Sequence, residues 1–249
     1  MIHEETIQKL IDLKLHAMAA AARELANGPP RKDLTAEELL GMIVDREQSH
    51  RDNRKLTRRL KEAKLTSIAA SIEEVTCEPA RGLQKTVVRS LGTCAYVRAK
   101  QNVIVVGATG TGKSYLGAAL AHAACRAGFR ALFTRSSRLL HELSIARGDG
   151  SYAKVLQRLA RTEVLVLDDF LITPLKDQER RDLLEVLEDR YDRASTVITT
   201  QVPTKTWHET LADPTIADAI CDRVIHNAHV INLTGPSIRK LRGLKTDQP

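Results

Sequence analysis

The chain has 249 residues, of which 43% are hydrophobic and 28% are charged, so it can bury a globular core and is not intrinsically disordered. Its formal net charge of +7 favours acidic partners, but aromatic residues make up only 3%, too few for a stacking platform that binds single-stranded nucleic acid. The sequence contains no apolar run long enough to span a membrane and no signal-peptide region at its start, so we expect a cytoplasmic protein with no membrane partner.

The first part of the chain is predicted to be helical. Apolar residues recur at helical spacing from Ile7 to Leu25, which predicts a first helix over residues 1–26. A second helix is expected from Thr35 to about Lys64, because Thr35 and Glu38 have the spacing of a capping box. A third helical piece is expected over Ser67–Val75. We therefore predict a small all-helical N-terminal domain.

The second predicted helix is strongly basic in its later half. Between Arg46 and Lys64 the sequence has eight basic and three acidic residues. Such a patch is suited to a polyanion, although a solvated helix face with charges paired along the helix would give the same pattern. The candidate DNA-binding residues in this stretch are Arg51, Arg54, Lys55, Arg58, Arg59 and Lys61.

After a junction at Cys77–Gly82, the pattern changes from about residue 83, where short apolar runs begin to alternate with helical stretches. The alternation predicts an α/β domain with a parallel sheet of five strands covered by helices on both faces. We therefore expect a domain boundary between 1–76 and 77–249. The predicted strands are Val103–Val106, Arg130–Phe133, Val164–Leu167, Thr196–Thr199 and His229–Leu233.

The first of these strands leads into a complete phosphate-binding motif, G-x-x-x-x-G-K-S, which is followed by a helical run. Glycines let the backbone wrap closely, so that N–H groups and the helix N-terminus face phosphate oxygens. Lys113 is expected to reach the β- and γ-phosphates of ATP, and the Ser114 hydroxyl to hold Mg²⁺. The predicted nucleotide-binding residues are Gly107, Ala108, Thr109, Gly110, Thr111, Gly112, Lys113, Ser114 and Tyr115.

Two aspartates end the third predicted strand. Ligands bind at the carboxyl ends of the strands in such sheets, so Asp168 is expected to hold Mg²⁺ and Asp169 to orient the attacking water. Capping or loop aspartates would look the same without the phosphate loop. At the end of the fourth strand, Thr200 or Gln201 is expected to help place that water, or to be an ordinary polar residue leaving a strand.

Taken together, these residues resemble the IstB-like ATPases, transposition helper proteins of bacterial insertion sequences, which are related to the DnaC-like helicase loaders of the AAA+ group. The resemblance covers nearly the whole chain and includes LKLHAMA, DREQSHRDNRKLTRRLKEAKL, GATGTGKS, VLVLDDF and a long C-terminal run that contains DRVIHNAHV and GPSIRK. The sequence departs from the family at Leu171, where a glycine is common.

The resemblance implies roles that the residues alone do not. Arg223 matches an arginine finger that completes the ATP site of a neighbouring subunit, and Arg239 matches an arginine that senses the γ-phosphate. From the residues alone, the favoured interpretation of Arg223 is a salt bridge on a helix surface with an acid such as Asp222 or Asp218, and the resemblance reverses that preference. The implied fold is a P-loop AAA+ core without a C-terminal lid domain. The implied protein is a homo-oligomeric, Mg²⁺-dependent ATPase. It would bind the phosphate backbone of duplex DNA and assist a transposase.

Two other functions share some of these features. A DnaC-like loader of a replicative helicase has the same ATPase core, and its N-terminal helices would bind a helicase in place of a transposase. A P-loop kinase with a small acceptor has the same phosphate loop, but the paired aspartates favour water as the acceptor.

Overall fold

The computed structural model describes residues 4–29 and 34–238. The chain forms two compact units, one ending at Arg58 and the other beginning at Arg59. The helix α3 continues from the first unit into the second. The predicted boundary between functional domains, after residue 76, stays a prediction. In the structure, residues 59–76 belong to the same compact unit as the sheet.

The first unit contains α1 (Glu4–Asp12), α2 (His16–Asn27) and most of α3 (Ala36–Glu62). The prediction of one continuous helix over residues 1–26 is wrong, because Lys14 adopts a left-handed φ of 61° between α1 and α2. The Leu15 N–H donates to the Leu10 carbonyl across this break, a bond of the Schellman type that ends helices. Glycine usually occupies such a position, so the lysine gave no signal of a break.

The start of α3 confirms the predicted capping box. The Thr35 N–H donates to the Glu38 carboxylate over 2.7 Å, and the Glu38 N–H donates to the Thr35 hydroxyl over 3.2 Å. The core of this unit is small and consists of buried Ala21, Ala22 and Ile43 with a few half-buried neighbours.

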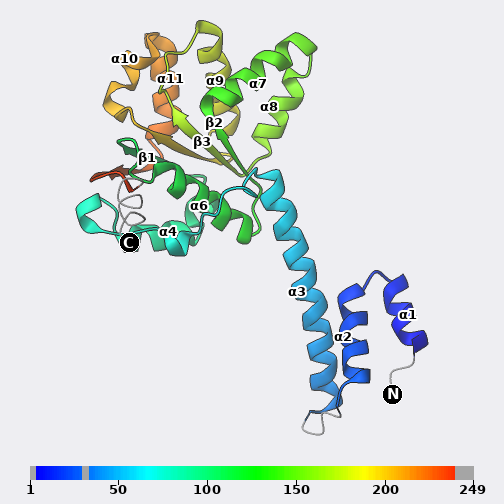
Figure 1. Ribbon diagram of the computed structural model, residues 1–249. Helices are drawn as coiled ribbons and strands as arrows, with labels where there is room; N and C mark the ends of the chain where they lie inside the picture. Colours follow the sequence, from blue (N-terminus) through cyan, green and yellow to red (C-terminus); the bar gives the residue numbers. More distant parts are fainter. Residues whose placement is uncertain (1–3, 30–33, 239–249) are drawn as a thin grey trace, which may run out of the picture. The chain divides into compact units, whose positions relative to one another are not determined.

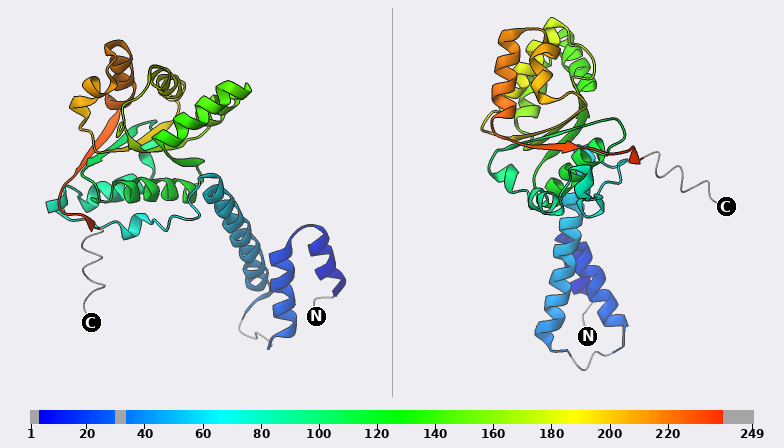
Figure 2. Two further views of the ribbon diagram at one scale, coloured as in Figure 1. Left: turned by 45° about the horizontal axis from the view of Figure 1, so that its top comes forward. Right: turned by 90° about the vertical axis from the view of Figure 1, so that its left-hand side faces the viewer.

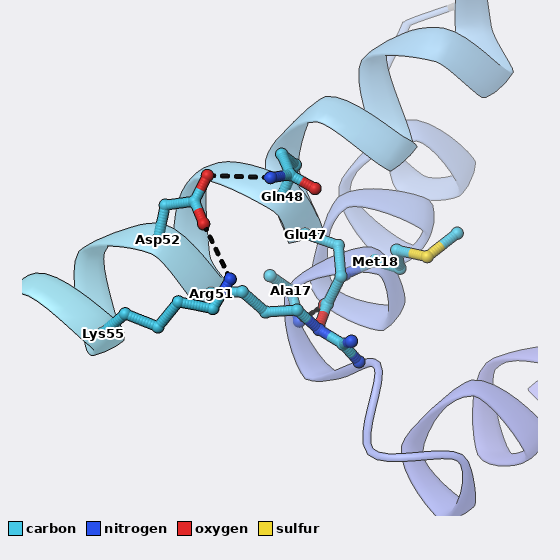
Figure 3. A network of polar contacts seen from close by, with 7 residues as sticks. All are labelled: Ala17, Met18, Glu47, Gln48, Arg51, Asp52 and Lys55. Carbon is cyan, nitrogen blue, oxygen red and sulfur yellow. Dashed lines mark hydrogen bonds and ion pairs between the residues drawn. The ribbon is translucent and has the colours of Figure 1, made fainter. Parts of the chain in front are cut away.

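A buried carboxylate on α3 caps the other long helix of this unit (Figure 3). The N-cap position of α2 has no side-chain cap of its own. Glu47, which is 6% exposed, accepts hydrogen bonds from the N–H groups of Ala17 and Met18 over 3.0 and 3.1 Å. Arg51 donates to the same carboxylate over 2.8 Å, and this hydrogen bond lowers the pKa of Glu47. Glu47 therefore joins α2 to α3 through the helix N-terminus.

We expect Glu47→Ala to increase amide hydrogen exchange at Ala17 and Met18 by about tenfold, since an N-terminal cap is lost. Because the pKa of Glu47 is lowered on folding, its contribution is complete above the ordinary glutamate pKa and disappears as the pH falls through the lower folded value. The control is Gln48→Ala, an exposed neighbour on α3. Equal rates of amide hydrogen exchange at Ala17 and Met18 in the two variants would contradict the capping role of Glu47.

The second unit begins with short elements that lead to the sheet. They are the 3₁₀ turns Ile72–Glu74 and Pro79–Arg81, then α4 (Lys85–Gly92) and α5 (Ala95–Arg98). The helical piece predicted over Ser67–Val75 is wrong, because only the single turn Ile72–Glu74 forms there.

Five parallel strands form one sheet in the order β2-β3-β4-β1-β5, which confirms the prediction of a parallel sheet. The central strands are rich in buried β-branched residues, as expected for a sheet covered on both faces. The strand bounds are β1 Asn102–Gly107, β2 Ala131–Arg135, β3 Val164–Phe170, β4 Ser195–Thr200 and β5 Ala228–Leu233.

Helices cover both faces of this sheet. Figures 1 and 2 show α6 with α4 on one side and α7, α9 and α11 on the other. The helix α6 follows β1 and packs on β2, β3 and β4, and β1 lies between β4 and β5, so the loop between β1 and α6 follows an interior strand of the sheet. The remaining helices are α6 Lys113–Arg126, α7 Ser136–Asp149, α8 Tyr152–Ala160, α9 Asp177–Arg190, α10 Trp207–Leu211 and α11 Pro214–Ile225, with a 3₁₀ turn at Thr204–Thr206.

None of the helices in residues 4–29 and 34–238 is long and apolar enough to cross a bilayer.

Candidate functional site

The predicted phosphate loop connects β1 to α6 as expected. The strand is buried as far as Val106, and the helix begins at Lys113. Gly110 and Gly112 have φ values of 85° and 98°, a region that glycine enters without strain. Lys113 is 6% exposed, and its amine donates to the Ala108 carbonyl over 2.9 Å within the loop. The loop therefore has the fold that a phosphate cradle requires.

A bulge at the end of β3 places both predicted aspartates opposite one threonine of β4. Leu167 pairs with Ile198 and Phe170 with Thr200, so that Asp168 and Asp169 together face Thr199. The Thr199 hydroxyl donates to the Asp168 carboxylate. It also accepts a hydrogen bond of 3.4 Å from the Asp169 N–H.

These contacts fix the direction of each aspartate. Asp168 is 4% exposed, and its carboxylate is held by Thr199. Asp169 is half-buried, adopts a φ of 57°, and has a carboxylate oxygen 3.9 Å from Nε of Arg135. Leu171 also has a left-handed φ of 57°, a region that glycine enters without strain.

Thr199 and Arg135 are site residues that the sequence analysis missed. The end of β4 suggested Thr200, but the structure does not bring Thr200 into the site. Its side chain is fully buried, donates to the Phe170 carbonyl over 2.7 Å, and accepts from the Val202 N–H over 3.0 Å. Gln201 does reach the phosphate loop, where its side chain accepts a hydrogen bond of 2.8 Å from the Thr109 hydroxyl.

A cavity of about 620 Å³ opens at this edge of the sheet. Its polar lining includes the phosphate loop, Ser114, Arg135 and the two aspartates. The lining also includes the apolar side chains of Ile68, Val75, Leu83, Leu233 and Ile238. A cavity lined by both phosphate-binding groups and apolar side chains fits a nucleotide.

Tyr115, the last predicted nucleotide-binding residue, lines the same cavity. Its hydroxyl donates to the Glu74 carboxylate over 3.1 Å and accepts from the Ser71 N–H over 3.3 Å. Tyr115 therefore attaches the segment that precedes α4 to the first turn of α6.

The structure describes only one of the two predicted site arginines. Arg223 lies on α11, where its guanidinium pairs with Glu188 of α9, and this hydrogen bond raises the pKa of Arg223. Its carbonyl accepts from the Asn102 side chain over 3.2 Å, at the start of β1, whereas the phosphate loop follows the other end of that strand. The structure thus keeps Arg223 away from the chain's own phosphate loop. Arg239 lies outside the described residues.

All six candidate DNA-binding residues lie on α3. Four of them share one face of the helix, because Arg51, Arg54, Lys55 and Arg58 are spaced by three or four residues. Arg51 pairs with Glu47 over 2.8 Å, and Lys55 pairs with Asp52 over 3.1 Å. Part of the positive charge is therefore compensated within the helix.

With this geometry established, we compared the chain with known proteins. A model of the family described as "IstB-like ATP binding protein" matches residues 8–246. The chain belongs to this family.

Relatives of this IstB-like protein carry names of the same kind. An insertion-sequence ATP-binding protein of Sinorhizobium fredii is 43% identical over 96% of this chain and 98% of its own length. The ATP-binding protein of insertion sequence IS21 from Pseudomonas aeruginosa is 32% identical over 91% of this chain and 85% of its own length.

Solved structures that resemble this IstB-like protein share its fold at low sequence identity. The DnaC helicase loader has a TM-score of 0.53 at 18% identity and covers 67% of this chain and 98% of its own. AMPPCP-bound DnaA from Aquifex aeolicus has a TM-score of 0.57 at 11% identity and covers 73% of this chain and 56% of its own. The fold is therefore that of the P-loop AAA+ proteins, as the sequence predicted.

Proposed function

We propose that this protein hydrolyses ATP with Mg²⁺, assembles on duplex DNA, and assists the transposase of its insertion sequence. The observation that carries the proposal is the joint placement of the phosphate loop and the aspartate pair opposite Thr199, in a chain whose relatives are named as insertion-sequence ATP-binding proteins.

The phosphate loop and the two aspartates have separate roles in the proposed reaction. Lys113 binds the β- and γ-phosphates, and Ser114 and Asp168 would hold Mg²⁺, which neutralises phosphate charge. The buried Asp168 carboxylate at a strand end, fixed by Thr199, fits that role. Asp169 lies beside it and is directed toward the cavity, so it orients and polarises the attacking water. Arg135 forms an ion pair with the Asp169 carboxylate, with Nε 3.9 Å from the carboxylate oxygen, and so adds positive charge beside it.

The ATP site is proposed to be completed between subunits. Arg223 lies at the opposite end of β1 from the phosphate loop, so it can act on ATP only in a neighbouring copy. ATP bound between subunits would then stabilise a homo-oligomer. Water attack on the γ-phosphate would remove that contact and release the assembly.

Two basic surfaces support DNA as the partner, one in each unit. The first is the face of α3 that carries Arg54 and Arg58. The second is a groove of about 430 Å³ at the start of β2, which contains one acid, Glu62. Its basic residues are Arg59, Lys64, Arg130, Lys154, Arg158 and Arg161. Lysines and arginines without base-reading partners suit the phosphate backbone, so binding should depend little on sequence and strongly on salt.

Sedimentation of the full chain with duplex DNA, in ATP, in ADP and without nucleotide, tests the function. We expect a large protein–DNA assembly in ATP alone, and Lys113→Ala should lose both this assembly and ATP turnover. A Lys113→Ala protein that keeps both would contradict the proposal. A chain that stays monomeric and free of DNA in all three conditions would contradict the DNA part, and binding to a replicative helicase would then be measured.

The salt dependence of DNA affinity tests the basic groove separately. The double variant Lys154→Ala/Arg161→Ala removes two exposed charges, so the dependence of log affinity on log salt should fall by about 1–2 in slope. Lys205→Ala, an exposed lysine elsewhere in the same unit, is the matched control and should leave the slope unchanged. An unchanged slope in the double variant would remove the groove from the DNA path.

A further inference from the structure

Arg81 looks like a surface residue in the sequence but is buried in the structure. It belongs to a series of basic residues between positions 81 and 100. In the fold it ends the 3₁₀ turn Pro79–Arg81 and is only 7% exposed. Within the described part of the chain it makes no ion pair with a carboxylate. A buried guanidinium that has no carboxylate partner must be compensated by other acceptors.

The acceptors of Arg81 are two carbonyls from segments far apart in the sequence. One terminal nitrogen lies 3.5 Å from the Thr111 carbonyl, in the phosphate loop. The same nitrogen donates to the Pro236 carbonyl over 3.2 Å, in the segment that follows β5. Arg81 thus joins the phosphate loop to the segment Leu233–Ile238. Its own carbonyl accepts from the Thr234 N–H over 3.0 Å, which strengthens the same junction.

The segment Leu233–Ile238 also contacts the phosphate loop directly. The Ile238 N–H donates to the Gly110 carbonyl over 2.9 Å. A Cβ atom on Gly110 would lie 2.2 Å from the Ser237 hydroxyl, so no other residue fits at Gly110 while this segment is in place. The glycine is therefore needed for this contact as well as for the fold of the loop.

These contacts determine where the N–H groups of the loop point. In a trans peptide the C=O and N–H groups point in opposite directions, and no cis peptide is present in the described residues. Holding the Thr111 carbonyl on one side fixes the Gly112 N–H on the other side. Holding the Gly110 carbonyl fixes the Thr111 N–H of the same peptide group, which within the loop also donates to the Ala108 carbonyl over 3.4 Å. Loop N–H groups are the donors that bind phosphate oxygens.

We propose that Arg81 is a positioning residue for the phosphates of ATP. Through the Thr111 carbonyl, and together with the Ile238 N–H, it holds the loop in the conformation that binds the β- and γ-phosphates. Because it also binds the Pro236 carbonyl, the segment Leu233–Ile238 and the phosphate loop form one unit, and nucleotide binding orders both. This inference rests on the proposed use of the loop for ATP and does not depend on DNA or a transposase.

The first test compares nucleotide affinities of Arg81→Met and Arg89→Met. Arg89 is an exposed arginine of the same basic series and is the matched control. The dissociation constants of ATP and AMP are measured by competition with a ribose-labelled fluorescent ATP, at 10 °C, where each variant is shown to be folded by circular dichroism. We expect Arg81→Met to weaken ATP by tenfold or more and AMP by less than threefold, because AMP lacks the phosphates that the loop binds.

A purely structural role would give a different result. It would lower the melting temperature of the variant without nucleotide, and it would leave the ratio of the ATP and AMP constants as in the unmodified protein. If Arg81→Met does not fold, Arg81→Lys decides, since a lysine keeps the charge but reaches fewer acceptors. It should weaken ATP several-fold with AMP unchanged. Equal weakening of both nucleotides, or ATP affinity within twofold of the unmodified protein, would overturn the inference.

A second variant removes the other contact that holds the phosphate loop, the hydrogen bond between Ile238 and Gly110. Ile238→Pro removes the N–H that donates to the Gly110 carbonyl. It should reproduce the selective loss of ATP affinity, and its effect should be less than additive with that of Arg81→Met because both act on adjacent peptide groups. Fully additive effects would overturn the shared mechanism. Failure of the unmodified protein to bind ATP would instead count against the proposed function.

Discussion

Two inactive variants are expected to restore ATP turnover to each other when mixed. Arg223→Ala should lower turnover by about 10³-fold or more, since it removes the charge that stabilises the transition state, while ATP still binds. Lys113→Ala should be inactive for a different reason, because it changes the phosphate loop. In a mixed oligomer, an intact loop from one variant meets an intact arginine from the other.

The size of the recovery follows from the geometry. Arg223 is held at the start of β1 and the phosphate loop follows its end, about 17 Å away at 3.3 Å per residue, so one chain cannot use both in one site. In an equal, random mixture, a quarter of the interfaces combine an intact loop with an intact arginine, so turnover should recover to no more than about that fraction, because Lys113→Ala also loses ATP-driven assembly. No recovery at any mixing ratio would contradict an arginine supplied by a neighbour.

Glu188→Gln distinguishes this role from a salt bridge on the protein surface. Arg223 pairs with Glu188 in the structure, and the pair alone could be its purpose. If so, Glu188→Gln should reduce turnover as much as Arg223→Ala does. If Arg223 acts on a neighbour's ATP, Glu188→Gln leaves the guanidinium in place, and turnover should stay within a few-fold of the unmodified protein.

The phosphate loop and Asp168 were predictable because their signals are local. A buried strand, a fixed spacing of glycines and a following helix all lie within a short stretch, and each supports the same structure. The number of strands and their parallel direction also follow from the alternation of apolar runs and helices. These features need no knowledge of contacts between distant residues.

Thr199 was missed because the register between β3 and β4, which places it opposite Asp168, leaves no sequence pattern. Thr200 was chosen because it ends β4, on the edge of the sheet where the phosphate loop lies. One extra residue in β3 shifts the pairing, so Thr199 meets both aspartates and Thr200 turns into the interior. Pairing between strands that are distant in the sequence decides which side chain reaches the site.

Buried arginines are the other feature that sequence reasoning missed. Arg81 and Arg190 both lie in charged stretches, and charged residues are normally exposed. Their burial depends on carbonyl groups that come from other segments of the chain. The sequence shows the donor but not the acceptors, so neither residue could be distinguished from a surface arginine.

Arg190→Met is expected to be the most destabilising of the substitutions considered. The Arg190 side chain is 1% exposed and lies at the end of α9. Its guanidinium donates to the carbonyls of Leu159, Thr162 and Ser195 and to the Thr196 hydroxyl. Methionine has a similar length but no donor, so it would leave three buried carbonyls without these partners. At about 1–3 kcal/mol for each unsatisfied group, with partial relaxation, we expect a loss of about 3–5 kcal/mol in unfolding free energy.

Thermal unfolding followed by circular dichroism measures this loss, and the melting temperature should fall by roughly 10 °C. Arg190→Lys should lose about half as much, because an ammonium group reaches fewer of the acceptors. Arg193→Met, an exposed neighbour, is the control and should change the melting temperature by less than about 1 °C.

The position of these carbonyls connects stability to the site. Leu159 and Thr162 precede β3, and Ser195 begins β4, so Arg190 fixes the starts of the two strands whose other ends carry Asp168 and Thr199. At a temperature where Arg190→Met is still folded, that pairing persists, and ATP affinity should be unchanged. A variant that melts like the unmodified protein would show that the carbonyls find other donors, and a folded variant with weakened ATP binding would show that the ends of β3 and β4 shift when Arg190 is lost.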